Sequence, residues 1–270
     1  MNKTKIEWCD STWNPVTGCL HDCEYCYARK IAHRFGKPDT GNAGGIIDPR
    51  SGCKLHEIDE PVIDVLVNKR IPYPYDFSPT LHKYRLNEPQ KWSDPHTIFV
   101  GSMADLFGEW VPDEWIDAVI DACKEAPQHR YLFLTKNPKR YAELDDGKRM
   151  RLPPKNNMWY GATTTNSLQL SVAIKSFGSL SSNAKTFLSV EPILEDISQC
   201  EEWSKAIYYK YVDWVIIGAE TGNRKNKVVP EKAWIDNICE SADVAQIPIF
   251  MKDSLIPIVG EENMRREFPR

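Results

Sequence analysis

The sequence predicts an α/β fold built on parallel strands, and two observations support that prediction. From Thr97 onward, short and nearly unbroken apolar runs alternate with helical patterns, in units of about thirty residues. Unbroken apolar runs are typical of strands that are covered on both faces. The chain has 270 residues, a length that fits one α/β barrel with an insertion.

Seven parallel strands are expected, of which the first covers Thr12–Val16. The other six are the apolar runs Thr97–Ser102, Arg130–Thr135, Met158–Thr163, Lys185–Val190, Asp213–Gly218 and Ile247–Met251. We therefore predict one domain over residues 1–270, a partial parallel (β/α) TIM-type barrel of six to seven units.

The sequence indicates where four helices begin. The first is expected over Tyr27–Phe35, directly after a cysteine-rich loop. Pro112 begins another, because proline suits the first turn and the two acidic residues after it stabilise a helix N-terminus. Asn166 is expected to cap a third helix and Pro230 to open a fourth. The last three segments carry apolar stripes at helical spacing.

Residues 37–96 break this rhythm and are predicted to form an insertion after the first helix. The segment is rich in glycine, proline, tyrosine and charge, with turn signals at 41–45 and 71–75. Its aliphatic and aromatic residues give it surface to bury, which favours a folded segment over a disordered one. We expect it to contain a few short helices and to shape the substrate site.

Composition limits the function classes. The net charge of −4 gives no global positive field that would indicate nucleic acid. The first seven residues lack the apolar stretch of a signal peptide, and the longest apolar run, around Trp214, is too short to span a bilayer. Eight cysteines without a secretion signal favour a reducing compartment. We therefore expect a cytoplasmic protein with no membrane partner.

Cys19, Cys23 and Cys26 lie within eight residues and form the strongest functional signal. Thiolates this close suit a soft metal centre better than a disulfide framework. Iron–sulfur clusters normally use four protein thiolates, so a cysteine triad leaves one iron open for chemistry. The alternative is a structural zinc site that His21, inside the same loop, completes. Cys53 and His56 form a weaker Cys-x-x-His pair, and Cys123 and Cys239 fall on apolar helix stripes typical of core residues.

Polar side chains follow each predicted strand, at the end where parallel barrels gather their chemistry. They are Ser102 and Asp105, Thr135 and Lys136, Thr163 to Thr165, Ser189 and Glu191, Glu220 and Thr221, and Lys252 and Asp253. The cysteine loop follows the first strand, so we expect it on the same face. Single residues of this kind can simply mark where strands emerge into solvent, but the whole ring beside a cysteine triad favours an active site.

The cysteine spacing, with an aromatic directly before the third cysteine, resembles the radical S-adenosylmethionine (SAM) superfamily. Five further segments are similar to an uncharacterised family common in phages and prophages that is grouped with radical SAM proteins. These are 6–8, 12–19, 99–107, 133–138 and 218–222, and the resemblance covers essentially the whole chain. More distantly, the segments around Ser102–Asp105 and Thr135-Lys136 resemble the spore photoproduct lyase group.

This resemblance implies a [4Fe-4S] cluster on the three cysteines, with SAM on the open iron. One electron then splits SAM into methionine and a 5′-deoxyadenosyl radical, which abstracts hydrogen from an unknown substrate. The electron donor would be a protein such as flavodoxin or ferredoxin. Tyr25 would lie near the adenine, and Ser102 and Asp105 would take the place of the usual Gly-Gly-Glu, which is absent. The weaker candidates for SAM contacts are Thr163, Thr165 and Glu191, and those for catalysis are Lys136, Glu220 and Lys252.

Two questions stay open at this level. The missing Gly-Gly-Glu leaves room for a non-catalytic iron–sulfur or zinc-binding protein associated with phages. Several cations fall in loops expected on the catalytic face: Lys136, Lys139, Arg140, Arg224, Lys225, Lys227 and Lys252. Such a cluster could hold the phosphates of a nucleic acid or nucleotide substrate, because the local field matters more than the net charge. The alternative is a solvated loop surface, with a peptide or small molecule as substrate.

Overall fold

The computed structural model describes residues 1–24, 26–37, 45–48, 52–145, 152–153, 157–222 and 225–269. The chain divides into two compact units, Met1–Asn137 and Pro138–Arg270. Tyr25 and Arg224, two residues singled out in the sequence, lie outside the described residues. None of the helices in the described ranges is long and apolar enough to cross a membrane.

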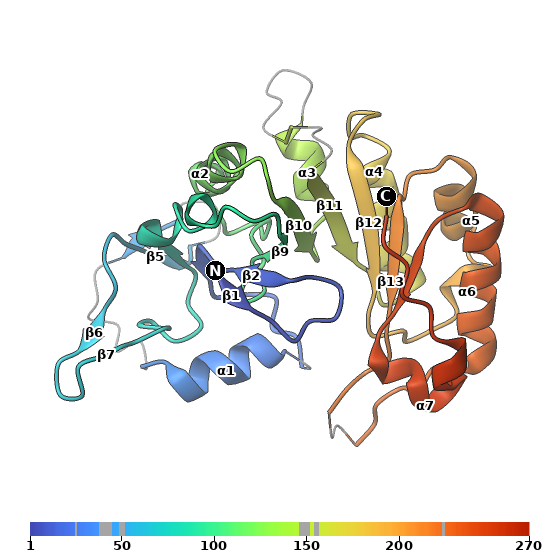
Figure 1. Ribbon diagram of the computed structural model, residues 1–270, viewed down its shortest axis with the longest axis horizontal. Coiled ribbons are helices and arrows are strands. Elements are labelled where there is room, and N and C mark those ends of the chain that lie inside the picture. The colour runs from blue at the N-terminus through green and yellow to red at the C-terminus, as the bar shows by residue number, and fades with distance from the viewer. Residues whose placement is uncertain are drawn as a thin grey trace. The chain divides into compact units, whose positions relative to one another are not determined.

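The larger sheet of the first unit contains three parallel strands. These are β2 (Ser11–Trp13), β9 (Thr97–Val100) and β10 (Arg130–Thr135), paired in that order, with β1 (Asn2–Lys3) antiparallel to β2 (Figure 1). Trp13 lies opposite Val100, and Phe99 lies opposite Leu132. All four side chains are buried, as expected for strands covered on both faces.

Two α-helices of this unit begin where the sequence predicts. Helix α1 (Tyr27–Phe35) starts at Cys26, whose Sγ accepts a hydrogen bond from the backbone N–H of Arg29 at 3.4 Å. Helix α2 (Asp113–Lys124) follows Pro112 and has two acidic residues in its first turn. Its apolar stripe is buried, and this burial fixes the helix against the unit.

The described part of the insertion contains five short strands, and of the few short helices predicted it contains only two 3₁₀ turns. A small sheet has the order β3 (Val16–Thr17), β8 (Thr80–His82), β5 (Lys54–Ile58) and β4 (Ile46–Ile47), and β6 (Ile63–Asp64) pairs with β7 (Lys69–Arg70). Helical structure is limited here to the 3₁₀ turns η1 (Lys83–Arg85) and η2 (Pro89–Lys91). Pairing with β3, which precedes the cysteine loop, buries Leu81 and stabilises strands that local sequence signals do not reveal.

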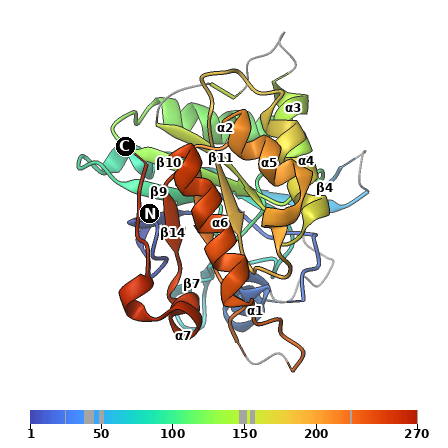
Figure 2. The ribbon, with the colours of Figure 1, turned by 90° about the vertical axis from the view of Figure 1, so that its right-hand side faces the viewer.

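The second unit is a regular α/β arrangement. Its strands β11 (Met158–Thr163), β12 (Lys185–Val190), β13 (Trp214–Ile217) and β14 (Ile249–Met251) are parallel and paired in chain order. The helices are α3 (Lys139–Leu144), α4 (Ser167–Phe177), α5 (Glu201–Tyr208), α6 (Lys232–Ala245) and α7 (Ile256–Val259), with 3₁₀ turns η3 (Ile197–Gln199), η4 (Asp253–Leu255) and η5 (Glu261–Asn263). Helices α3 to α6 each contact the next, and Figure 2 looks onto α4, α5 and α6.

The coarse prediction of a mixed α/β fold with mostly parallel strands is confirmed. Strands β10, β11 and β12 have the predicted bounds, and Asn166 caps α4 by accepting a hydrogen bond from the N–H of Gln169 at 2.9 Å. The predicted first strand is divided into β2 and β3 by Asn14 and Pro15, since proline has no N–H for a ladder. Closure of the seven strands into a partial barrel involves both units together and stays a prediction.

Candidate functional site

The three clustered cysteines lie on the loop between β3 and α1, and all are free, half-buried thiols. Burial, with smaller contributions from charge repulsion by Asp105, Cys23 and Cys26, raises the pKa of the Cys19 thiol to about 12. Cys19 therefore interacts electrostatically with both other cysteines.

The donor set of this loop fits a soft metal centre, because three sulfur ligands within one short segment are what such centres use. In the described ranges, however, no three His, Cys, Asp or Glu side chains are gathered in an arrangement that could hold a metal ion. The ligand types in the loop therefore suit a metal centre, whereas the described side chains are not arranged around a common metal position.

Backbone contacts hold the start of the cysteine loop. The N–H of Gly18 donates to the carbonyl of Met103 at 2.9 Å, and the N–H of Cys19 donates to that of Phe77 at 3.2 Å. Gly18 has a φ of +87°, and a Cβ there would lie 2.3 Å from the carbonyl oxygen of Ser78. Glycine is required at this position both by the backbone conformation and by the close approach.

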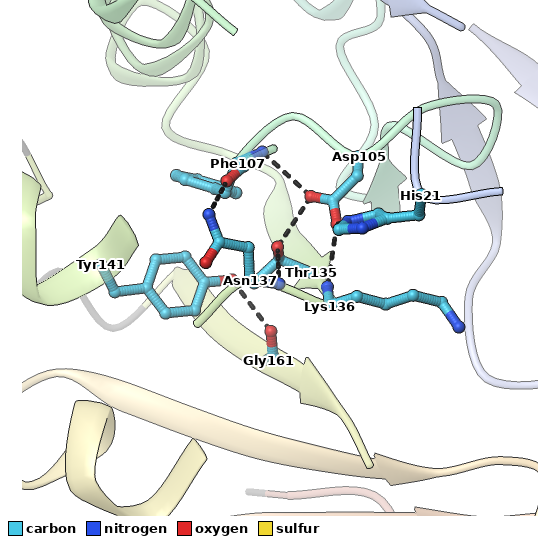
Figure 3. Close-up of polar contacts among 8 residues, drawn as sticks. All are labelled: His21, Asp105, Phe107, Thr135, Lys136, Asn137, Tyr141 and Gly161. Atoms are coloured by element: carbon cyan, nitrogen blue, oxygen red, sulfur yellow. Dashed lines mark hydrogen bonds and ion pairs between the residues drawn. The ribbon is translucent and has the colours of Figure 1, made fainter. Parts of the chain in front are cut away.

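Asp105 is the centre of a hydrogen-bond network that joins three segments (Figure 3). Its Oδ2 contacts Nε2 of His21 at 2.7 Å and accepts from the N–H of Lys136 at 2.8 Å. Its Oδ1 accepts from the hydroxyl of Thr135 at 2.7 Å and from the N–H of Phe107 at 3.0 Å. The carboxylate is buried, and these four contacts use about all of its acceptor capacity. Asp105 therefore connects the cysteine loop to the carboxyl end of β10.

A second polar group surrounds Ser102. Oδ1 of Asn14 accepts hydrogen bonds from the Ser102 hydroxyl at 3.1 Å and from the N–H of Met103 at 2.9 Å. The hydroxyl of Tyr27 donates to the Ser102 carbonyl at 2.6 Å. Sequence reasoning did not assign roles to Asn14 and Tyr27, although the first lies within the predicted first strand and the second follows Cys26 directly.

A pocket of about 450 Å³ opens beside this group, and Ser102, Asn14, Thr12, Tyr27, Ile31 and Tyr73 are among its lining residues. This volume is in the range of small-molecule sites. The walls combine apolar surface with amide and hydroxyl groups, as such sites commonly do. Of the predicted SAM-binding residues, Ser102 thus lies at a pocket, whereas Asp105 is committed to the network described above.

In the second unit, the structure brings Glu191 and Lys252 together as an ion pair. They follow the carboxyl ends of β12 and β14 and lie beside Gly218, which follows β13. A Cβ at Gly218 would be 3.2 Å from Cδ of Lys252 and 3.3 Å from Cγ of Glu191. The pair therefore packs tightly over the end of the central strand.

Three other predicted residues of this unit are more dispersed. Thr163 is half-buried at the end of β11, opposite Ser189. The hydroxyl of Thr165 donates to Oε1 of Gln169 at 3.0 Å, so it belongs to the start of α4. Glu220 is buried beyond β13. None of these contacts tests their predicted roles.

The predicted cationic loops are only partly exposed. Arg140 is buried and its guanidinium contacts Glu143 at 3.1 Å, while Lys252 is paired with Glu191. Lys139, Lys225 and Lys227 are exposed, and Lys136 is half-buried, with its side chain extending away from Asp105 in Figure 3. Cys123 and Cys239 are buried, as expected.

The chain belongs to the family described as "Protein of unknown function (DUF5131)", whose profile matches residues 3–256. No curated protein sequence matches the chain.

Two solved structures are similar in fold, and both are variants of spore photoproduct lyase. One has AdoMet and a dinucleoside spore photoproduct bound, with a TM-score of 0.48 and 11% identity over 90% of this chain and 63% of that one. The other has a TM-score of 0.51 and 10% identity over 93% of this chain and 78% of that one. The chain thus spans less than two thirds of the first structure, and the second supports a shared fold.

Proposed function

We propose that this member of the DUF5131 family is a radical SAM enzyme that binds a [4Fe-4S] cluster through Cys19, Cys23 and Cys26. The observation that supports this most is the set of three free thiols on one loop, which the His21–Asp105 contact ties to the segments at the ends of β9 and β10. The fold likeness to spore photoproduct lyase supports it as well. When bound, the cluster supplies an electron that splits SAM into methionine and a 5′-deoxyadenosyl radical, which abstracts hydrogen from the substrate.

Asp105 acts in this proposal as a positioning residue. Its lone pairs are used by His21, Thr135 and two backbone N–H groups, so direct binding of SAM would break contacts that hold the cysteine loop. Ser102, at the pocket, is better placed to contact SAM directly. Tyr25 beside the adenine, Thr163, Thr165 and Glu191 as further contacts, and Lys136, Glu220 and Lys252 as catalytic groups belong to the same proposal.

Anaerobic reconstitution of the full chain with iron and sulfide tests this function. We expect about four irons per chain, an electron paramagnetic resonance signal on reduction that changes when SAM is added, and slow release of 5′-deoxyadenosine. A flavodoxin or ferredoxin, the proposed cytoplasmic donor, should replace the chemical reductant. Protein that holds a full cluster but neither binds nor cleaves SAM would establish the non-catalytic alternative instead.

A structural zinc site is the second candidate, and the His21–Asp105 contact favours it. Metal-binding histidines commonly donate their second ring N–H to a carboxylate, as Nε2 of His21 could do here. Nδ1 would then join the three thiolates as the fourth ligand. Replacing His21 with alanine separates the candidates, because a zinc site would lose its metal whereas a three-cysteine cluster site would still take up iron.

A further inference from the structure

Helix α1 presents an unusual outward face. Five exposed residues occupy it at helical spacing: Tyr27, Lys30, Ile31, Arg34 and Phe35. Tyr27 is 52% exposed and Phe35 is 54% exposed, whereas Ala28 and Ala32 of the same helix are buried. We call these five residues the α1 face. Large aromatic side chains and cations thus alternate along one solvent-exposed stripe.

The charge of α1 has a single sign. Its nine residues include Arg29, Lys30, His33 and Arg34 and no carboxylate, in a chain whose net charge is −4. Arg29 pairs with Asp22 and His33 with Asp76, while Lys30 and Arg34 point to the exposed stripe. The guanidinium of Arg34 lies 5.2 Å from the centre of the Phe35 ring. The helix therefore offers a local positive field to an anionic partner.

The aromatic side chain nearest the cysteine loop is held in place. The hydroxyl of Tyr27 donates to the carbonyl of Ser102, so this side chain is held in one orientation although the residue is about half exposed. Tyr27 and Ile31 also line the 450 Å³ pocket, with Lys5 at the same opening. The α1 face and the pocket are therefore continuous, and a ring that is already ordered binds a stacked base at little entropic cost.

We propose that the α1 face binds single-stranded nucleic acid, with phosphates on Lys30 and Arg34 and bases stacked on Tyr27 and Phe35. The two rings are eight residues apart, about 12 Å along the helix. Stacked nucleotides rise about 3.4 Å each, so three to four of them span this length. A duplex hides its base faces, which is why the exposed rings favour a single strand. This inference names the substrate class of the proposed enzyme and rests on that proposal for the reaction.

Binding of a fluorescein-labelled DNA single strand of about twelve nucleotides to the full chain tests the inference, by fluorescence anisotropy without SAM or reductant. We expect affinity to fall between about 50 mM and about 200 mM salt. Lys30→Gln with Arg34→Gln should weaken binding about tenfold or more at low salt and make the salt slope shallower by about 1.4, because two phosphate contacts are lost. Tyr27→Ala should weaken binding about tenfold with the slope unchanged, and Tyr27→Phe, which keeps the ring, should bind nearly as wild type.

The matched control is Lys91→Gln with Lys175→Gln, which makes the same charge change at two exposed lysines that do not belong to helix α1. It should leave binding within about twofold. Circular dichroism confirms that each variant is folded. Three outcomes would overturn the inference: no binding by wild type at about 50 mM salt, an equal loss in the control, or preference for vesicles of anionic lipid over the oligonucleotide. Oligonucleotide binding by a protein whose reconstituted and reduced form does not cleave SAM would instead overturn the proposed reaction and leave the binding surface intact.

Discussion

His21 and Asp105, which are 84 positions apart in the chain, are joined by a 2.7 Å contact between Nε2 and Oδ2. The contact ties a side chain inside the cysteine loop to the loop that follows β9. Through the Thr135 hydroxyl, the same carboxylate also reaches the end of β10. The position of the three thiols therefore depends on a buried residue that does not itself belong to the loop.

Asp105→Ala is expected to lower the free energy of unfolding by about 2–4 kcal/mol, because the Thr135 hydroxyl and two N–H groups lose their buried acceptor. Urea denaturation measures the change. Asp121→Ala, which removes an exposed carboxylate paired with Lys124, should cost less than about 0.5 kcal/mol. Equal effects of the two substitutions would show that the Asp105 network does not stabilise the fold.

The thiol prediction concerns metal uptake. Alanine at Cys19, Cys23 or Cys26 should each abolish the iron–sulfur absorbance of reconstituted protein, since no ligand can be lost from a three-cysteine site. Cys200→Ala and Cys239→Ala should keep the absorbance, because these thiols lie outside the cysteine loop. The measurement is the visible spectrum together with iron and zinc content. Stoichiometric zinc without iron in protein purified anaerobically would contradict the cluster.

Two glycines with positive φ make a matched pair. Gly18→Ala should destabilise the protein by more than about 3 kcal/mol and reduce iron uptake, because left-handed strain adds to a clash with the backbone of Ser78. Gly52 has a φ of +67°, and no atom of the described residues lies within 4 Å of the place that a Cβ would take. Gly52→Ala should therefore cost only about 1 kcal/mol. Thermal unfolding and iron content measure both. A similar loss in the two variants would mean that the close approach at Gly18 is unimportant.

Much of the fold was predictable because the signals are local. Apolar runs such as Arg130–Thr135 and the cap at Asn166 determine their elements without long-range information. The small sheet of the insertion was not predictable, since Lys54–Ile58 becomes a strand through pairing with Thr80–His82. Short, mixed-polarity strands of this kind lack a distinctive pattern.

Part of the candidate site was also predictable from the sequence, and part was not. The cysteine spacing identified the loop from sequence alone. The hydrogen-bond network around Asp105 could not be predicted from the sequence, because its four partners come from positions between 21 and 136. Nor could the pairing of Glu191 with Lys252, whose separation of 61 positions leaves no sequence signal.

His82 gives a pH prediction. Burial, then Arg85 and Arg70, lowers its pKa from 6.5 to about 2, and its ring contacts the Thr17 hydroxyl at 2.8 Å. Because the folded pKa lies below the unfolded one, the unfolded state takes up the proton first as pH falls. The stability that neutral His82 contributes to the fold is fully present above pH 6.5. It is lost as the pH falls towards 2, by up to about 1.4 kcal/mol per pH unit.

Urea denaturation between about pH 7 and about pH 5 measures this loss. His82→Gln should reduce the number of protons taken up on unfolding by about one, so the stability falls less steeply with decreasing pH. His33→Gln, at an exposed histidine, should leave the fall in place. An unchanged pH dependence in His82→Gln would contradict the assignment.

Glu191 and Lys252 allow structural and catalytic roles to be separated. The side chains of Glu191 and Lys252 are about three quarters buried, at 25% and 22% exposure, over Gly218. Lys252→Met should lower the free energy of unfolding by about 1–2 kcal/mol, because the Glu191 carboxylate is left without its cation. Adding Glu191→Gln removes that unpaired charge, so the double variant should regain part of the loss.

SAM cleavage in the same variants gives the second measurement. If Lys252 is a catalytic group and Glu191 a SAM contact, the double variant should stay slow in releasing 5′-deoxyadenosine although its stability has recovered. Lys205→Met, which breaks an exposed pair with Glu201, should change neither quantity appreciably. Recovery of both stability and rate in the double variant would show that the pair only supports the ends of β12 and β14. Lys252 would then leave the group of catalytic candidates.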